Sequence, residues 1–333
     1  MTRILAIESS CDETAVAITE NGKLLANVVA TQISVHEKYG GVMPEIASRL
    51  HTENVTICLK EALRQAKLNL EDIDAFAVTR GPGLIGCLHV GLQTAKTLAM
   101  LYKKPLIPVH HLAGHIYANE YNGELKFPLL CVVVSGGNTE LVLMRDHLDF
   151  EIIGETCDDA VGESYDKVAR VMGLPYPGGL PIDSAAKKGE HTYDLPVPRV
   201  GENEFDFSYS GLKTAVINLV NQAKMKGEEI RVNDLARSFQ DTAIGMVLKK
   251  SIKAAKKFDV KQLVLAGGVS ANSYLRSQIQ EQLKGSGIDV VIPPLWCTTD
   301  NAAMIAKIGE HLYKEKLFAP LSLSVDPNWK IDK

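Results

Sequence analysis

One pattern of strands and turns occurs in both halves of the sequence, and this repeat constrains the fold more than any other feature. The first half opens with a short apolar run at residues 3–7, followed by a small polar turn and further β-like runs at 15–19 and 23–30. The step Asn21-Gly22 separates the last two runs, and such a step between β-like runs is a strong hairpin signal. The first half is therefore expected to begin with three strands.

The second half opens in the same way. An apolar strand at residues 129–134 and a second strand at 139–144 flank the small polar turn 135–138, and a third strand is expected at 150–153. The two openings predict an internal duplication, with its boundary near residues 123–127.

Later in each half a buried-type strand runs into a glycine-rich turn and then a helix. In the first half the strand is expected at residues 74–79 and the helix at 87–102. In the second half the strand is expected at 262–266 and the helix ends near residue 283, while a longer helix is expected at 232–257. Strands that alternate with helices predict α/β sheets covered on both faces.

The size of the chain also favours two domains. It has 333 residues, of which 46% are hydrophobic, and this exceeds what one core usually needs. We expect one lobe at residues 1–125 and another at 126–333, with the C-terminal helix a candidate to cross over to the first lobe. The stretch 176–209 is rich in Pro, Gly and Asp, and is expected to be an irregular insert.

The charge balance bears on nucleic-acid binding. The net charge of −4 excludes a strong basic field over the whole surface, so any nucleic acid requires a local basic patch or a partner. Candidate lysines for such a patch are Lys249, Lys250, Lys253, Lys256 and Lys257, and Lys187 with Lys188. For the first group, a solvated helix face is an explanation of at least equal weight.

The sequence favours a cytoplasmic protein with no membrane association. No apolar run reaches the roughly 18 residues that a membrane span needs, and Glu8 interrupts the first run, so no signal peptide is expected. The six cysteines are scattered and form no CxxC pair, which is typical of reduced thiols.

Two histidines have the spacing of a metal-binding pair. His111 and His115 are four residues apart, about 40° around a helix, so both imidazoles can face one ion. The zinc-protease motif HExxH needs a glutamate after its first histidine, and that position is Leu112 here. Asp300 is the best distant third ligand, and two histidines with a carboxylate suit Fe²⁺ or Zn²⁺. The alternatives are structural histidines and an Asp300 that only caps a helix.

Glycine turns follow a strand in both halves. The turn at 135–138 lies between two β-like runs, and Gly267-Gly268 opens a helix. Glycine lets the backbone approach a phosphate, successive N–H groups form an anion-binding nest, and a helix N-terminus favours an anion. Either turn alone is also explained as a tight structural turn. Together, at equivalent positions, they indicate a nucleotide site built from hairpin turns, as in the actin-like ATPase and sugar-kinase architecture.

Acidic residues follow the third strand of the second half. They gather at residues 157–167, and Asp183 comes after a further glycine turn at 178–179. Acids near glycine turns suit ribose hydroxyls or a metal. The alternative is an ordinary helix start with Asp158 and Asp159 in its first turn.

These motifs together resemble the tRNA N6-adenosine threonylcarbamoyltransferase family, called TsaD in bacteria. The resemblance extends over residues 3–310, and the motifs that carry it lie at residues 7–14, 39–45, 81–84, 110–115, 134–138 and 266–272. Several motifs in order are far more specific than any one of them. The length is similar to that of the bacterial members.

The resemblance implies an actin-like ATPase fold of the sugar-kinase and Hsp70 type, with two duplicated lobes and the active site in the cleft between them. It implies transfer of a threonylcarbamoyl group from threonylcarbamoyl-adenylate to N6 of the adenosine 3′ of the anticodon, with release of AMP. The tRNAs concerned read codons that begin with A. The family's bacterial partners are an inactive paralogue (TsaB-like) and a small ATPase (TsaE-like).

The resemblance also assigns roles to residues. It implies that His111, His115 and Asp300 hold one divalent metal, with Fe²⁺ favoured and Zn²⁺ the alternative. The residues expected to line the donor, chiefly at its phosphate, are Val134, Ser135, Gly136, Gly137 and Asn138. Those expected to hold the nucleoside are Asp166, Gly179, Asp183 and Asn272. Glu13 is expected to support catalysis.

Three other functions compete with this expectation. A phosphotransferase of the same fold needs ATP and Mg²⁺ and leaves the histidine pair idle. A metalloprotease lacks its base because of Leu112, and a non-catalytic scaffold has no use for the trio of His111, His115 and Asp300.

Overall fold

The computed structural model describes residues 1–198 and 200–333 and divides them into two compact units. The first unit is Met1–Tyr121 with Pro294–Lys333, and the second is Asn122–Pro293. These bounds differ from the expected 1–125 and 126–333 because the last segment of the chain, with its helix α10 (Ala302–Lys314), packs on the sheet of the first unit.

The first unit contains a mixed five-stranded sheet in the order β3-β2-β1-β4-β5. Its strands are β1 (Arg3–Glu8), β2 (Glu13–Glu20), β3 (Lys23–Thr31), β4 (Ala75–Gly81) and β5 (Leu106–His110). The first three are antiparallel, whereas β4 and β5 run parallel to β1. The predicted hairpin between β2 and β3 is confirmed, since Asn21 and Gly22 both have positive φ.

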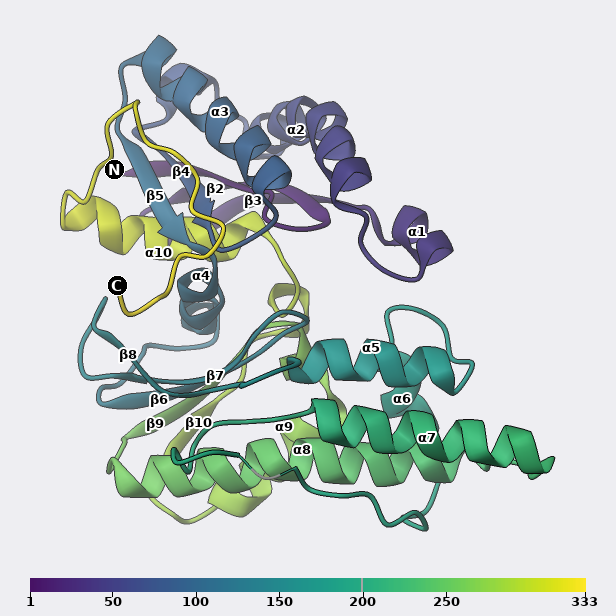
Figure 1. Cartoon of the computed structure of the whole chain (residues 1–333). Coiled ribbons are helices and arrows are strands. Elements are labelled where there is room, and N and C mark those ends of the chain that lie inside the picture. Colours follow the sequence, from purple (N-terminus) through teal and green to yellow (C-terminus); the bar gives the residue numbers. More distant parts are fainter. Residues whose placement is uncertain (199) are drawn as a thin grey trace. The chain divides into compact units, whose positions relative to one another are not determined.

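Helices cover both faces of this sheet, as Figure 1 shows. The helices α2 (Pro44–Ala66) and α3 (Ile85–Tyr102) lie on one face, and α10 lies on the other (Figure 1). Burial on both faces explains why β1 is an apolar run rather than an alternating one. Leu5 and Ile7 join the core under α2 and α3, whereas the side chain of Ile4 lies against Gly309 of α10.

The smaller helical pieces of the first unit lie in its connections. They are α1 (Ile33–His36), α4 (His111–Tyr117) and the 3-10 turns η1 (Glu37–Tyr39), η2 (Leu70–Asp72), η3 (Ala118–Tyr121) and η5 (Leu295–Cys297).

The second unit repeats the topology of the first. Its sheet has the order β10-β9-β6-β7-β8, which is the order of the first sheet with each strand replaced by its counterpart. The strands are β6 (Leu129–Val134), β7 (Thr139–Met144), β8 (Phe150–Glu155), β9 (Gln262–Ala266) and β10 (Asp289–Val291). The neighbours of β6 are antiparallel β7 and parallel β9. The predicted duplication is therefore confirmed.

The helices of the second unit are α5 (Val161–Val171), α6 (Gly179–Ala186), α7 (Ser210–Lys226), α8 (Val232–Lys257) and α9 (Ser273–Leu283), with the 3-10 turn η4 (Gly268–Ala271). The long helix α8 is central to the core, where Phe239 packs edge-on against Tyr165 of α5 at 5.0 Å between ring centroids.

Part of the stretch expected to be irregular is regular and buried. Residues 179–186 form α6, although Gly179 and Pro181 stand at its start. Ile182, Phe205 and Phe207 pack into the core of the second unit. Residues 187–198 and 200–209 contain no helix or strand, as expected, so the departure from the predicted irregular insert is confined to α6. Arg199 lies outside the described residues.

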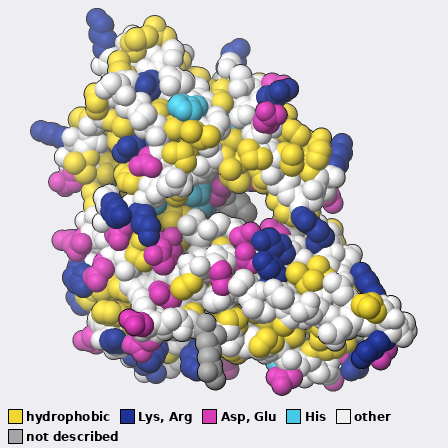
Figure 2. All heavy atoms as spheres, viewed as in Figure 1, with side chains coloured by type: hydrophobic (Ala, Val, Ile, Leu, Met, Phe, Trp, Pro, Cys, Tyr) yellow, Lys and Arg dark blue, Asp and Glu magenta, His cyan; other side chains and the backbone are white. Residues whose placement is uncertain are grey.

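One face of the molecule carries charges of both signs. On the face shown in Figure 2, Lys and Arg side chains are interspersed with Asp and Glu side chains. Within residues 1–198 and 200–333, none of the helices combines the length and the apolar character needed to cross a membrane.

Candidate metal centre and nucleotide loops

The ends of three parallel strands of the first unit form the edge from which the helix with the two candidate histidine ligands, α4, begins. Because β1, β4 and β5 are parallel neighbours, their carboxyl ends meet at one edge of the sheet. Glu8 ends β1, Thr79 lies near the end of β4, and His110 ends β5 directly before α4. The side chain of His110 caps α4 by accepting a hydrogen bond from the Leu112 amide.

The two predicted histidines face each other on α4. His111 and His115 are one turn apart, with 4.8 Å between ring centroids, and both are buried. Asp300 comes from the segment before α10, and its Oδ1 lies 3.0 Å from Nε2 of His115 and 3.5 Å from Nε2 of His111. The ligand atoms of the three residues all lie within 4.8 Å of one another. This donor set fits Fe²⁺ or Zn²⁺.

The prediction that Asp300 caps the following helix is wrong. Asn301 is the N-cap of α10, and its side chain accepts a hydrogen bond from the Met304 amide at 3.1 Å. Both residue types are good caps, and the chain uses Asn301. The carboxylate of Asp300 is therefore directed to the histidines instead.

A buried carboxylate behind His111 was not predicted from the sequence. Glu8 is fully buried, and its Oε2 lies 3.1 Å from His111 Nδ1. Since a carboxylate accepts, Nδ1 carries the hydrogen and donates it, which leaves Nε2 directed to Asp300. Glu8 also accepts hydrogen bonds from the Ser10 amide and the Thr79 hydroxyl. A carboxylate–histidine pair of this kind commonly supports a metal ligand.

Burial and charge act in opposite directions on this cluster. Burial is the largest single influence on the Glu8 and Asp300 carboxyls and raises the pKa of each. The charge of His111 and the hydrogen bonds that Glu8 accepts together bring the pKa of Glu8 below its ordinary value. The charges of His111 and His115, with the hydrogen bond from His115, lower the pKa of Asp300 to about 2. Burial lowers the pKa of His111, but Asp300 and Glu8 together raise it to about 9. The metal-free cluster therefore holds a cationic imidazole between two carboxylates, an environment that favours a cation.

The residue between the histidines excludes one chemistry. Leu112 occupies the position of the HExxH glutamate, and its side chain is 3% exposed. An apolar buried side chain cannot act as a general base. The zinc-protease arrangement is therefore absent at this motif.

Glu13 begins β2 near the same cluster. Its carboxyl accepts a hydrogen bond from the Thr31 hydroxyl at 3.2 Å. Burial, reinforced by the charges of Asp12 and Asp300, raises the pKa of Glu13 to about 10 in the metal-free chain. A carboxyl that stays neutral at pH 7 can donate a hydrogen bond as well as accept one.

The loop that leads to Glu13 is fixed from one side by a buried histidine. His51 of α2 donates from Nε2 to the Cys11 carbonyl at 2.9 Å, and its Nδ1 accepts from the Thr14 hydroxyl at 2.7 Å. Burial and neighbouring acids raise the pKa of the Cys11 thiol well above its ordinary value, so Cys11 stays protonated at neutral pH. All six cysteines are free thiols.

The C-terminal segment of the chain contacts the residue that caps α4, the helix that carries His111 and His115. Nε2 of His110 donates to the Trp329 carbonyl at 2.9 Å, and the two rings meet edge-on at 5.1 Å between centroids. Arg80 stacks on the Trp329 ring at 4.8 Å, and its carbonyl accepts from the Asp326 amide. Nothing in the local sequence of this segment indicates these interactions.

The second unit presents the predicted glycine turn at its own sheet edge. Gly136 and Gly137 follow β6, are exposed, and have open space where a Cβ atom would lie. Two other glycines hold the turn closely. A Cβ on Gly162 would lie 2.5 Å from the Ser135 carbonyl oxygen, and one on Gly267, which has positive φ, would lie 2.5 Å from that of Val134. The turn is thus fixed while its tip remains accessible.

The turn is also held by its own hydrogen bonds. The Ser135 amide donates to the Asn138 carbonyl at 2.9 Å, and the Ser135 hydroxyl accepts from the Asn138 amide at 3.0 Å. The two exposed glycines stand between these residues.

The predicted nucleoside residues form two groups near this turn. Asp166 lies one turn after Gly162 on α5, and its carboxylate accepts from the Gly178 amide at 2.7 Å, next to the exposed Gly179. The carboxylate of Asp183 of α6 accepts a hydrogen bond from the Ser273 hydroxyl, which lies 2.8 and 3.0 Å from its two oxygens, and it pairs with Lys187.

Asn272 adjoins the second group through its neighbour Ser273. Its side chain caps α9 by accepting from the Leu275 amide and donates to Gln240 at 2.8 Å. These contacts give Asn272 a structural role in the fold.

The interpretation of Asp158 and Asp159 as first-turn residues of a helix is wrong, because both precede α5. Asp158 instead accepts from the first residues of α7.

Comparison with solved structures defines the class of fold. The activator of the 2-hydroxyisocaproyl-CoA dehydratase from Clostridium difficile, solved with bound ADPNP, matches with a TM-score of 0.53 at 15% identity, over 95% of this chain and 96% of that chain. With the two duplicated five-stranded sheets, this places the chain among proteins of the actin-like ATPase fold, as predicted.

Sequence comparison defines the family. The family model for TsaD, the tRNA N6-adenosine threonylcarbamoyltransferase, matches residues 23–307. A tRNA N6-adenosine threonylcarbamoyltransferase of Bacillus cereus is 53% identical over 333 residues, which is 99% of this chain and 97% of that protein. One from Listeria welshimeri is 55% identical over 92% of this chain and 90% of its own. The chain therefore belongs to the tRNA N6-adenosine threonylcarbamoyltransferase family.

Proposed function

We propose that this chain transfers the threonylcarbamoyl group from threonylcarbamoyl-adenylate to N6 of the adenosine 3′ of the anticodon, and releases AMP. His111, His115 and Asp300 hold one divalent metal for this reaction, with Fe²⁺ favoured over Zn²⁺. The observation that carries the proposal is the convergence of their ligand atoms within 4.8 Å, although Asp300 is 185 residues from His115 in the sequence.

The chemistry requires an activated donor. An adenine amine is a weak nucleophile, so the donor carbonyl has to become more electrophilic and the AMP leaving group has to be stabilised. A divalent ion supplies Lewis-acid polarisation and stabilises developing negative charge. The chain contributes the orientation of the ligands, since Glu8 keeps His111 Nε2 directed to Asp300.

The second unit is proposed to hold the donor. Val134, Ser135, Gly136, Gly137 and Asn138 line its phosphate side, where the exposed turn offers backbone N–H groups. The nucleoside part is assigned to Asp166, Gly179, Asp183 and Asn272. A carboxylate such as that of Asp183 can accept hydrogen bonds that the ribose hydroxyls donate.

Glu13 is proposed as a supporting residue of the reaction. Its neutral carboxyl, beside Asp300, is suited to donate a hydrogen bond to a substrate oxygen. It is not assigned a proton transfer.

The tRNA is the acceptor substrate. The proposed protein partners are a TsaB-like inactive paralogue and a TsaE-like small ATPase, and the proposed location is the cytoplasm. The membership in the family supports these assignments. The net charge of −4 adds a physical reason for partners, because a polyanion is not attracted by the chain as a whole.

The test is incubation of the chain and its accessory proteins with threonylcarbamoyl-adenylate and unmodified tRNA, followed by nucleoside analysis. Threonylcarbamoylated adenosine in stoichiometry with AMP supports the proposal. Absence of the modified nucleoside with every component present overturns it. Radiolabel from the γ-phosphate of ATP in a small acceptor would instead support the phosphotransferase alternative.

A further inference from the structure

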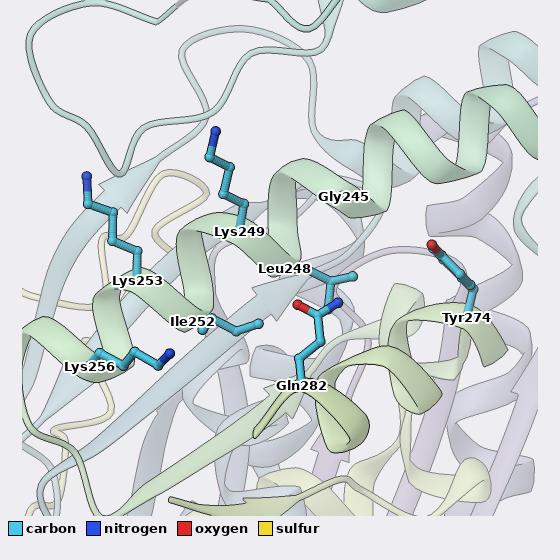
Figure 3. Close-up of a pocket in the computed structure, with 8 residues that line it drawn as sticks. All are labelled: Gly245, Leu248, Lys249, Ile252, Lys253, Lys256, Tyr274 and Gln282. Carbon is cyan, nitrogen blue, oxygen red and sulfur yellow. The ribbon is translucent and has the colours of Figure 1, made fainter. Parts of the chain in front are cut away.

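The C-terminal half of α8 carries a concentration of positive charge that the proposed chemistry does not use. Residues 249–257 contain five lysines and no acidic residue, in a chain whose net charge is −4. Lys249, Lys253 and Lys256 line one open pocket of about 450 Å³ with Tyr274 and Gln282 of α9. We call these three lysines, together with Tyr274 and Gln282, the lysine face, and Figure 3 shows them along the two helices.

The lysines at residues 249–257 differ in whether an acidic residue neutralises their charge. Glu204 pairs with Lys253 at 2.5 Å and with Lys257 at 2.9 Å. Lys249 and Lys256 are exposed and form no ion pair with the part of the chain that the structure describes. The pocket lining contains no acidic residue. Two ammonium groups therefore remain available for an external anion.

The other lysine group considered from the sequence contains one exposed lysine without an ion pair to the described residues, Lys188, rather than two. Lys187 pairs with the buried carboxylate of Asp183 at 3.0 Å. Its charge is thus partly neutralised within the fold, next to residues assigned to the nucleoside. The face on α8 is the better candidate for a large anionic partner.

Spacing and composition favour an extended anion. Lys249 and Lys256 are separated by about 10 Å along the helix axis, at 1.5 Å per residue. Such a row matches successive phosphates of one strand better than a single small anion. The half-buried ring of Tyr274 lies at the same pocket, with the guanidinium of Arg237 over it at 5.5 Å. Cationic side chains beside an aromatic ring are typical of single-stranded or looped RNA contacts.

We propose that the lysine face binds backbone phosphates of the tRNA substrate rather than the adenosine that is modified. This inference rests on the proposed function for the identity of the RNA. The face contributes affinity without sequence information, because phosphate contacts carry none. It also explains how a chain with net negative charge attracts a polyanion locally.

The test compares two double variants in the complete enzyme system. Lys249→Gln with Lys256→Gln removes the two unpaired charges, and Lys224→Gln with Lys226→Gln removes two exposed lysines from the end of α7 as the matched control. Direct binding of unmodified tRNA is measured as a function of salt, alongside the KM for tRNA, the KM for the donor, and kcat.

The α8 variant is expected to bind tRNA about tenfold more weakly at low salt. Its slope of log affinity against log salt should be smaller by about 1.4–1.8, because each phosphate that is no longer neutralised lowers the slope by about 0.7–0.9. The KM for tRNA rises accordingly, while kcat and the KM for the donor stay at the wild-type values. The α7 variant is expected to behave as wild type.

Equal tRNA affinity and equal salt slope in the two variants would overturn the inference. So would an α8 variant that no longer binds an accessory protein while its tRNA affinity is unchanged, since the face would then be a protein interface. Failure of the proposed function can be told apart from failure of this inference. It would appear as absent transfer by the wild-type system, whereas the binding measurement would still show whether the lysine face binds tRNA.

Discussion

Replacement of Glu8 with glutamine tests how far the metal ligands depend on the residues behind them. The substitution keeps the shape of the side chain but removes the charge that faces His111 Nδ1 at 3.1 Å. Glu8 receives hydrogens at both oxygens, from Ser10 at one and from Thr79 and His111 at the other. Glutamine has only one acceptor oxygen, so its amide group necessarily faces at least one donor.

The expected effect is on metal affinity. Loss of a carboxylate behind a histidine ligand typically weakens metal binding 10–100-fold, or by about 1.4–2.7 kcal/mol. Without the acceptor, the imidazole of His111 is free to adopt the other tautomer or to rotate, and Nε2 is no longer held toward Asp300. Glu8→Asp, which keeps the charge but shortens the side chain, should recover part of the affinity.

The assay is a competition titration of Fe²⁺ and Zn²⁺ against a chelator of known affinity, together with thermal unfolding of the metal-free protein. Glu20→Gln is the matched control, because Glu20 pairs with Arg3 on the same sheet but away from the cluster. If Glu8→Gln is folded and binds metal as tightly as the wild type and the control, the supporting role of this carboxylate is refuted.

Further substitutions test the metal ligands and the close backbone contacts. His111→Ala combined with His115→Ala should abolish both bound metal, measured by elemental analysis, and transfer. Gly137→Ala should leave the unfolding temperature unchanged, because nothing lies within 4 Å of its Cβ position, but it should raise the KM for the donor. Gly267→Ala should instead lower the free energy of unfolding by about 1–3 kcal/mol, because Gly267 has a φ of +86° and its Cβ would lie 2.5 Å from a carbonyl oxygen. In Gly81→Ala the new Cβ would lie 1.8 Å from a carbonyl oxygen of the C-terminal segment, so the unfolding temperature should fall.

Much of the fold was predictable because most strands are buried on both faces. The run 129–134 is a continuous apolar segment, 139–144 and 262–266 are apolar after their first one or two residues, and the strands have those bounds. The duplication was visible because the same turns recur at equivalent positions. The helix α6 was missed because Gly179 and Pro181 are typical of turns, and only packing on α8 makes that segment helical.

The candidate site was predictable where its residues are close in sequence or carry a motif. The spacing of His111 and His115 indicated the pair, but Asp300 was proposed from the chain's motifs rather than from local spacing. Glu8 and Trp329 were missed because their contacts with the metal helix depend on which strands are neighbours and where the C-terminal segment runs. Such long-range contacts leave no local pattern in a single sequence.

The most direct test of the proposed metal-dependent transfer is a titration of activity against bound metal. Metal-free chain is reconstituted anaerobically with increasing Fe²⁺, or in parallel with Zn²⁺, while accessory proteins, threonylcarbamoyl-adenylate and unmodified tRNA are in excess. We predict that threonylcarbamoylated adenosine, measured by nucleoside analysis, increases in proportion to bound ion and reaches its maximum at one ion per chain. Full transfer by the metal-free chain would contradict this prediction.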